Sequence, residues 1–352
     1  MSRDQPVTAA AGPAGIEPPA VSRWLAGHIE GVAEPVEFSL VSGGRSNLTY
    51  RVTDAAGAVW ALRRPPTGGV LSTAHDMSRE WRFISALAST GVPVPHPLGY
   101  CADPALTGAE FYVMSYVDGV VLADEESAAR LSPAARRTAG FALIDVLVAL
   151  HAVGLDATGL GDLARPEGYV ERQLRRWRRR LHEHGSPYLA LLDHVHDALA
   201  AHIPEQTSGI VHGDYRPGNL AFAEDGRVVA VFDWELATVG DPLADLGWLI
   251  ASWGQPGDDR PATMESPSTA PGFPARDELA GRYAKLSGRD LSALPYYVAF
   301  ARWRMACINV GVRARYLAGV MGDDGYDVEA RADLERRRAE AALEDIERLG
   351  LA

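Results

Sequence analysis

Strand-like segments of this sequence lie between residues 36 and 116, whereas long helical segments dominate from Ser132 onward. One amphipathic segment, 76–89, predicts a helix among the strands. Strands and helices are therefore segregated along the chain and do not alternate. This order excludes a doubly wound parallel sheet and predicts an α+β fold with two lobes. Runs of β-branched, aromatic and aliphatic residues predict strands over 36–41, 48–53, 58–64, 98–101 and 111–116.

The same segregation predicts the domain organisation. Residues 1–19 are rich in Ala, Pro and Gly and are expected to be disordered. Residues 20–117 are expected to form a small lobe with an antiparallel sheet and one helix, and residues 118–352 a larger, mainly helical lobe. That lobe is predicted to contain one β patch at 209–237 and an exposed Pro- and Gly-rich loop at 255–274. Its helices are expected over 132–151, 167–184, 187–202, 242–253, 276–287, 293–318 and 327–349.

The charge balance of the chain argues against binding to nucleic acid. Its 352 residues carry a net charge of −12, with Lys285 as the single lysine, whereas binding to a phosphate backbone needs a basic face. No CxxC motif occurs, so neither a disulfide framework nor a zinc cluster is predicted. Neither a signal-peptide pattern nor an apolar run of membrane-spanning length occurs, so we expect a cytoplasmic protein that does not bind membranes.

One segment carries a pattern of polar residues that indicates phosphoryl transfer. In His212-Gly-Asp-Tyr-Arg-Pro-Gly-Asn219, Asp214 follows the histidine by two positions and Asn219 follows Asp214 by five, which is the spacing of the kinase catalytic loop. Asp233 ends the next strand-like run. Mg²⁺ prefers oxygen ligands, so Asn219 and Asp233 are predicted to bind it. Asp214 is predicted to orient an acceptor hydroxyl and take its proton, and Arg216 to reach the transferred phosphate.

Two other interpretations of this segment carry less weight. An ordinary loop of Gly, Pro and Asn, followed by an acidic strand end, would have to match the kinase spacing at several polar positions by chance. A hydrolase that uses His212 and Asp214 would need a nucleophilic serine or cysteine on a sharp turn, and no GxSxG motif occurs.

The segments HGDYRPGN (212–219), FDWE (232–235) and GDPLADLGW (240–248) together resemble the aminoglycoside phosphotransferase/choline kinase-like family. The resemblance is strongest to the branch associated with acyl-CoA dehydrogenases, and it extends from about Val36 to about Leu317. It implies a protein-kinase-like fold that binds Mg²⁺ and ATP, with GTP as the alternative nucleotide, in a cleft between the lobes. These motifs are specific for the fold and far less specific for the acceptor.

The resemblance also implies a nucleotide site. The third strand of a kinase normally carries a lysine that contacts the α- and β-phosphates. Here Arg63 is assigned that role, with Arg64 as the alternative, and Glu80 on the following helix is its expected ion-pair partner. The other interpretation of Glu80 is an exposed surface residue. A phosphate-covering turn and the connector between the lobes supply the remaining assigned residues, which are Gly43, Gly44, Ser46, Met114 and Tyr116.

The acceptor is expected to be a small molecule with a hydroxyl group, because the Ala-Pro-Glu motif and long activation loop of protein kinases do not occur. Glu235, Trp303 and Arg304 are candidate acceptor contacts, and the last two favour a hydroxyacyl compound over an amino sugar. The missing lysine leaves a catalytically weak, nucleotide-binding pseudokinase as the alternative function. Asp245 is expected to be a buried bracket for the catalytic loop and Asp241 a helix cap.

Overall fold

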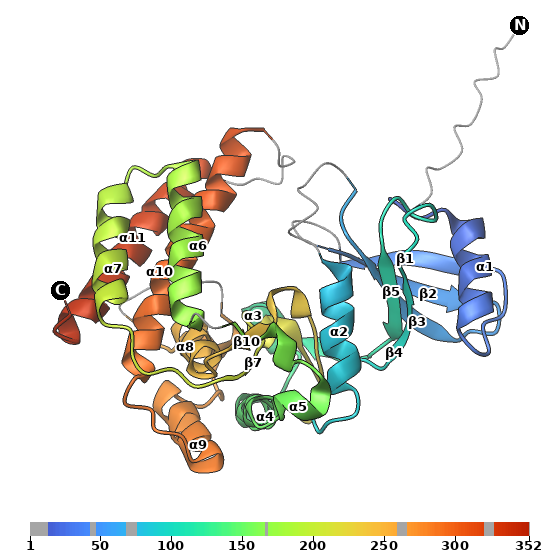
Figure 1. Cartoon of the computed structure of the whole chain (residues 1–352). Coiled ribbons are helices and arrows are strands. Elements are labelled where there is room, and N and C mark those ends of the chain that lie inside the picture. Colours follow the sequence, from blue (N-terminus) through green and yellow to red (C-terminus); the bar gives the residue numbers. More distant parts are fainter. Residues whose placement is uncertain are drawn as a thin grey trace, which may run out of the picture. The chain divides into compact units, whose positions relative to one another are not determined.

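The computed structural model describes residues 13–42, 47–67, 76–165, 168–258, 266–319 and 327–351. The chain forms two compact units (Figure 1). The N-unit comprises Met1–Ser89 and Val94–Val117, and the C-unit comprises Thr90–Pro93 and Asp118–Ala352. Strands dominate the first unit and helices the second, so the predicted α+β fold is confirmed. None of the described helices is both long and apolar enough to span a membrane.

An antiparallel sheet of five strands forms the N-unit, in the order β1-β2-β3-β5-β4. Helix α1 (Pro18–His28) and helix α2 (Met77–Leu87) lie on opposite sides of this sheet (Figure 1). The expected disordered segment 1–19 falls mostly outside the described residues, and α1 already begins at Pro18. The strands are β1 (Val36–Ser42), β2 (Leu48–Asp54), β3 (Val59–Arg64), β4 (Pro97–Cys101) and β5 (Phe111–Ser115).

Side chains alternate along these strands, and this alternation divides them between the two helices. Leu62 and Val113 pack with Leu25 of α1 in the apolar core of the unit. Arg63, the neighbour of Leu62, points to the opposite face and reaches Glu80 of α2. The face of β3 on which each of its two adjacent arginines lies therefore determines which of them can pair with α2.

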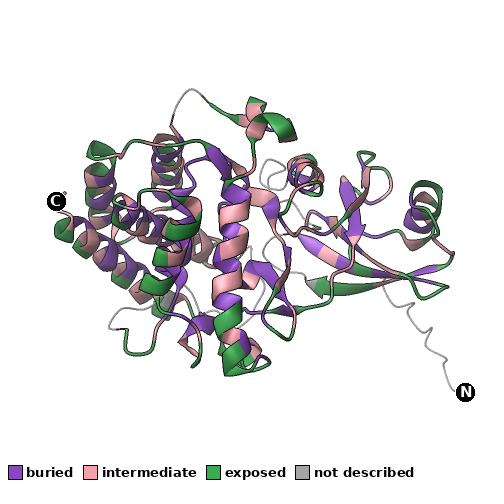
Figure 2. Cartoon of the chain, turned by 90° about the horizontal axis from the view of Figure 1, so that it is seen from below, coloured by how far each residue is buried: buried purple, intermediate pink, exposed green. Residues whose placement is uncertain are grey.

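Helices make up most of the C-unit. They are α3 (Glu125–Ala128), α4 (Pro133–His151), α5 (Leu155–Thr158), α6 (Tyr169–His184), α7 (Leu189–Ala201), α8 (Leu243–Ser252), α9 (Arg276–Ser287), α10 (Leu294–Leu317) and α11 (Val328–Arg348). Every residue of α8 is buried, and a Cβ atom at Gly247 would lie 2.6 Å from Cβ of Tyr297, so α8 and α10 are in close contact. Figure 2 shows buried residues along the inner sides of the longer helices and exposed residues on their outer sides. Helix α8 is thus a central element of this unit's core.

Two small sheets carry the polar motif of the C-unit. Strand β7 (Gly209–Val211) pairs with β10 (Thr238–Gly240), and β8 (Leu220–Phe222) lies between β6 (Val120–Val121) and β9 (Val228–Val231). The predicted β patch at 209–237 is therefore divided between two sheets, because β7 pairs with a strand that follows the motif. Strands β6 and β10 were not predicted, since two or three residues are too few to display a strand period.

The region 255–274 differs from the exposed loop that its composition predicts. Residues 259–265 lie outside the described residues, but Ser266 and Ser268 beyond them are buried. The Ser266 hydroxyl accepts a hydrogen bond from the Gly254 amide, and the Ser268 hydroxyl donates one to the Gly254 carbonyl. Small polar residues here form hydrogen bonds with buried backbone groups. Composition alone does not distinguish such residues from those of a solvated loop.

Candidate active site

The loop after β7 is shaped by close backbone contacts. Gly213 has a φ of +85°, and a Cβ atom at this position would lie 2.8 Å from the Leu236 carbonyl oxygen, so glycine is required. The neighbouring His212 is fully buried. Its Nε2 donates to the Phe232 carbonyl and its Nδ1 accepts from the Asp214 amide. Both ring nitrogens are thus used to hold the loop against the end of β9.

Asp245 of α8 binds the backbone of this loop. Its Oδ2 accepts from the His212 amide at 2.6 Å, and its Oδ1 accepts from the Gly213 amide at 2.8 Å. His151 of α4 lies 3.4 Å from Oδ2 and also bonds to the Tyr283 hydroxyl of α9. These side chains are buried. The expectation that Asp245 is a buried bracket for the catalytic loop is therefore confirmed.

Three side chains hold the carboxylate of Asp214. Trp248 of α8 donates its indole N–H to Oδ1 at 2.8 Å, and Asn219 donates its amide to Oδ2 at 2.8 Å. The Nε of Arg216 lies 3.3 Å from Oδ2, and the Asp214 side chain keeps 20% of its surface exposed, so a solute can reach it. Sequence reasoning missed Trp248, although it follows Asp245 by three positions and therefore lies on the same side of α8.

The pairing of β8 with β9 brings Asn219 next to Phe232, the residue before Asp233. Asn219 directly precedes β8, Leu220 of β8 pairs with Val231 of β9, and the Phe232 amide donates to the Asn219 carbonyl at 2.8 Å. Asp233 follows with a φ of +63°, the single non-glycine residue with a left-handed backbone among those described. Residues in this strained region of backbone space concentrate at functional sites.

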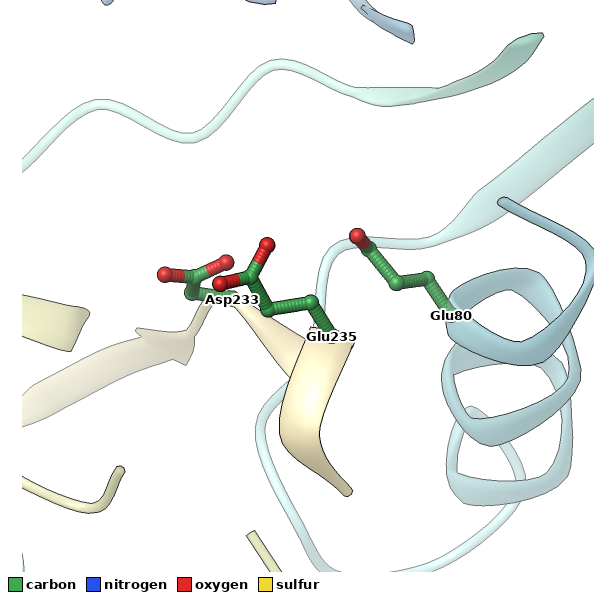
Figure 3. Close-up of side chains that lie close together, drawn as sticks. All are labelled: Glu80, Asp233 and Glu235. Atoms are coloured by element: carbon green, nitrogen blue, oxygen red, sulfur yellow. The ribbon is translucent and has the colours of Figure 1, made fainter. Parts of the chain in front are cut away.

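Asp233 and Glu235 contribute two carboxylates to the turn η3 (Trp234–Leu236). Figure 3 shows both side chains on this turn, and a carboxylate oxygen of one lies within 4.8 Å of one of the other. Asn219 donates both amide hydrogens to Asp214, at its carbonyl and its Oδ2, and this arrangement leaves Asn219 Oδ1 as an acceptor. Carboxylate and amide oxygens are the ligands that suit Mg²⁺, so this set of residues fits the predicted metal.

In the N-unit, Glu80 of α2, also drawn in Figure 3, is fully buried and accepts hydrogen bonds from several side chains. The donors are Arg63 Nε at 2.8 Å, Asn47 Nδ2 at 2.5 Å and the Tyr112 hydroxyl at 2.8 Å. The expected Arg63–Glu80 ion pair is therefore present, and the alternative of an exposed Glu80 is wrong. Arg64 points to the other face of the sheet and donates to backbone carbonyls there.

Glu80→Gln is expected to lower the free energy of unfolding by roughly 3 kcal/mol, because the buried Arg63 charge would lose this carboxylate partner. Urea denaturation measures the change. Glu37→Gln, at an exposed position of β1 in the same sheet, is the matched control and should change the value by less than about 0.5 kcal/mol. Equal stability of Glu80→Gln and the unmodified protein would contradict the ion pair.

The contacts of the other residues assigned to the nucleotide do not show whether these residues bind it. Met114 is buried within the sheet, and the Arg51 guanidinium lies over the Tyr116 ring at 5.1 Å from its centroid. Binding of adenine by Met114 and Tyr116 stays a prediction. The assigned residues of the phosphate-covering turn lie outside the described residues, and they are Gly43, Gly44 and Ser46.

Trp303 and Arg304 of α10, expected at the acceptor, occupy buried positions. Trp303 is fully buried and donates its indole N–H to the Leu192 carbonyl of α7 at 2.9 Å, so it packs between helices and no solute reaches it. Arg304 is 4% exposed and donates to the Gly213 carbonyl at 2.8 Å. The expectation that Trp303 and Arg304 contact the acceptor is therefore wrong, because α10 runs through the core and both side chains pack against other parts of the protein.

The ring residues on either side of Asp214 have structural roles. Tyr215 is fully buried and donates its hydroxyl to the Leu143 carbonyl. Burial, and to a smaller extent the charge of Asp245, raises the pKa of the Tyr215 phenol well above its usual value. This phenol therefore stays protonated, and His212 has both ring nitrogens engaged within the protein. A hydrolase with His212 as its base is not supported by these contacts.

Comparison with known proteins identifies the relatives of this chain. The sequence model of the phosphotransferase enzyme family (APH) matches residues 37–280. Acyl-CoA dehydrogenase family member 11 from Gallus gallus is 33% identical over 312 residues, which cover 84% of this chain and 39% of that protein. A provisionally named aminoglycoside phosphotransferase from Ralstonia eutropha, known from a crystal structure, aligns with a TM-score of 0.78 and 31% identity over 94% of this chain and 98% of its own.

More distant structures share the fold alone. The aminoglycoside phosphotransferase APH(2″)-IIa, solved with streptomycin and ATP, aligns with a TM-score of 0.59 and 16% identity over 91% of this chain and 96% of its own. This chain spans 39% of the length of the chicken protein, so the similarity concerns that part only. The family match covers most of the chain, including the catalytic loop, Asp233 and Asp245. The resemblance predicted from the motifs is thus confirmed, and the chain belongs to the phosphotransferase enzyme family.

Proposed function

We propose that the chain is an ATP-dependent O-phosphotransferase that phosphorylates a hydroxyl group of a small molecule. This proposal rests on one observation: Asp214, Asn219 and Asp233 lie close together in the C-unit. Asn219 contacts the Asp214 carboxylate directly and adjoins the end of β9 through the Phe232 amide. The ATP complex of a protein with the same fold supports ATP as the phosphate donor.

In the proposed reaction the acceptor hydroxyl binds the Asp214 carboxylate, which orients its oxygen and takes its proton. That oxygen forms a bond to the γ-phosphorus as the bond from this phosphorus to the β–γ bridging oxygen breaks, and ADP leaves. Asn219 and Asp233, with Glu235 nearby, would hold Mg²⁺, which supplies positive charge for the phosphate oxygens. Arg216 is 28% exposed and offers its guanidinium to the transferred group.

Positive charge around Trp177 of α6 favours an acceptor with an anionic group. The guanidinium groups of Arg176 and Arg180 lie 5.6 and 5.1 Å from the centre of this ring. The chain as a whole is acidic, so this concentration of arginine attracts anions locally. The name of the chicken relative refers to acyl-CoA. We therefore favour a hydroxyacyl compound on a phosphate-bearing carrier over an amino sugar as the acceptor.

Release of ADP from Mg-ATP tests the reaction and the acceptor class together. Hydroxy acids, hydroxyacyl-CoA esters, amino sugars and choline-like alcohols form the panel, with water as the background acceptor. We expect the hydroxyacyl-CoA esters to give the highest kcat/KM, and this value to fall as ionic strength rises, since exposed charges are screened by salt. Turnover of amino sugars without turnover of hydroxyacyl compounds would refute the acceptor class. ADP release at the background rate with every acceptor would refute the proposed kinase activity.

The pseudokinase alternative rests on the missing lysine of the third strand. Arg63 retains a positive charge at that strand position and pairs with Glu80 at 2.8 Å, so the ion pair is formed without lysine. Arginine and lysine differ in geometry, so an arginine here could hold the phosphates less well than a lysine. The pseudokinase alternative would then appear as a reduced rate of phosphoryl transfer. A thermal-shift titration with ATP discriminates, because a ligand that binds the folded state raises the melting temperature. A response that does not depend on Mg²⁺ would favour the pseudokinase.

A further inference from the structure

Trp248 is a buried indole in direct contact with the proposed proton acceptor. Its ring is 3% exposed and lies in an apolar cluster with Ala251, Ala301 and Met305, while its N–H donates to Asp214 Oδ1 at 2.8 Å. We propose that Trp248 is a positioning residue for phosphoryl transfer, which sets the orientation of the Asp214 carboxylate and is itself held by Arg304. This inference rests on the proposed function.

The hydrogen bonds of Asp214 distinguish its two carboxylate oxygens. Oδ2 accepts from Asn219 and lies next to Arg216, whereas Oδ1 accepts from Trp248. Each carboxylate oxygen can accept about two hydrogen bonds, so Oδ1 keeps a lone pair for the acceptor hydroxyl. The oxygen beside the indole is therefore the one that takes the proton. Without the indole N–H, the carboxylate could rotate toward Arg216, and this lone pair would no longer point at the acceptor.

Arg304 fixes both ends of the Trp248–Asp214 contact. Its Cζ lies 4.5 Å from the centre of a Trp248 ring, and its Nη2 donates to the carbonyl of Gly213, the residue before Asp214. Its Nε is buried without a hydrogen-bond partner among the described residues, so aromatic rings and one carbonyl form much of its surroundings. A cation over an indole is attracted by the ring electrons and so holds the ring in place. Arg304 thus acts through Trp248 and the loop backbone.

Trp253 provides a matched control at the end of the same helix. It is 1% exposed, and its indole N–H donates to the Pro274 carbonyl at 3.0 Å. Its replacement by phenylalanine therefore removes a similar buried ring and a similar hydrogen bond without touching the catalytic loop. The difference between Trp248→Phe and Trp253→Phe measures the positioning role apart from packing.

Steady-state kinetics provide the first test. We expect Trp248→Phe to lower kcat roughly 10- to 100-fold, the usual effect of one lost hydrogen bond to a charged group, with an unchanged KM for ATP. The probe reactions are hydrolysis of Mg-ATP and transfer to the acceptor that the ADP-release panel identifies. The benzothiophene isostere of Trp248, with sulfur in place of the indole N–H, preserves the ring shape and should show the same loss. Equal kcat values for Trp248→Phe and Trp253→Phe would overturn the inference.

An NMR experiment provides a second readout that is independent of turnover. In protein labelled with ¹⁵N-tryptophan, the indole resonance of Trp248 is the one missing from Trp248→Phe. Asp214→Asn should shift this resonance and leave that of Trp253 in place, and Arg304→Gln should shift it and speed its exchange with solvent. An unmoved Trp248 resonance in Asp214→Asn would overturn the inference. Absence of ADP release by the unmodified protein, in contrast, would refute the proposed function alone.

Discussion

Asp214→Asn is expected to lower kcat roughly 10³- to 10⁴-fold, the upper range for loss of a general base. The amide preserves the shape of the carboxylate but cannot take the acceptor's proton, and its single oxygen can accept from Trp248 or from Asn219 but not from both. The proposed metal ligands, Asn219 and Asp233, are unchanged. Mg-ATP should therefore raise the melting temperature of this variant as much as that of the unmodified protein. Turnover and thermal shift are measured on the same preparations.

Asp225→Asn is the control for this substitution. Asp225 is exposed on the turn between β8 and β9, where its carboxylate accepts from the Arg227 side chain. It lies on the same hairpin that positions Asn219, so the control tests whether any loss of carboxylate charge there affects turnover. We expect kcat to stay within about twofold, because exposed ion pairs contribute little. Full activity of Asp214→Asn on a confirmed acceptor would refute the assignment of Asp214.

The N-unit could be predicted closely because its sheet alternates between buried and less buried positions. In β2 the pattern runs through the whole of Leu48–Asp54, and the predicted strand 48–53 differs by one residue. The Arg63–Glu80 pair followed from the family resemblance. Local alternation shows that Arg63 and Arg64 face opposite sides, but it does not show which side α2 covers. That information comes from the packing of distant segments.

The contacts of Asp214 with α8 could not be predicted, because this helix has no polar side. All of its residues are buried, so apart from Asp245, which the motif placed against the catalytic loop, its sequence does not show which side chain meets Asp214. Trp248 of α8 donates to Asp214 on the loop after β7, while the neighbouring Gly247 lies against Tyr297 of α10, so the contact depends on how distant segments pack. The same limit applies to Arg304, whose target on the loop depends on how α10 packs. Sequence motifs located the residues to which we assign the chemistry, whereas the side chains that contact them depend on helix packing.

Asp233→Asn is expected to lower kcat/KM for Mg-ATP roughly 10³-fold, because a neutral amide replaces the carboxylate that we propose holds the metal. Asparagine tolerates the left-handed backbone of this position, where φ is +63°, so the fold should be retained. Steady-state kinetics measure kcat/KM, and in a thermal-shift titration with ATP the metal-dependent part of the shift should require a higher Mg²⁺ concentration than in the unmodified protein. Asp225→Asn again serves as the control, with an unchanged metal-dependent shift.

The concentration of Mg²⁺ then separates the role of Asp233 from that of Asp214. In Asp233→Asn, the amide oxygen of Asn219 and the Glu235 carboxylate, which lies within 4.8 Å of the Asp233 position, are still present. This weakened ligand set should bind metal at a higher concentration, so raising Mg²⁺ should restore part of the lost turnover. No concentration of Mg²⁺ should restore Asp214→Asn, because that variant lacks the proton acceptor and not the metal. If both variants responded equally to Mg²⁺, the division of roles between metal ligand and base would be wrong.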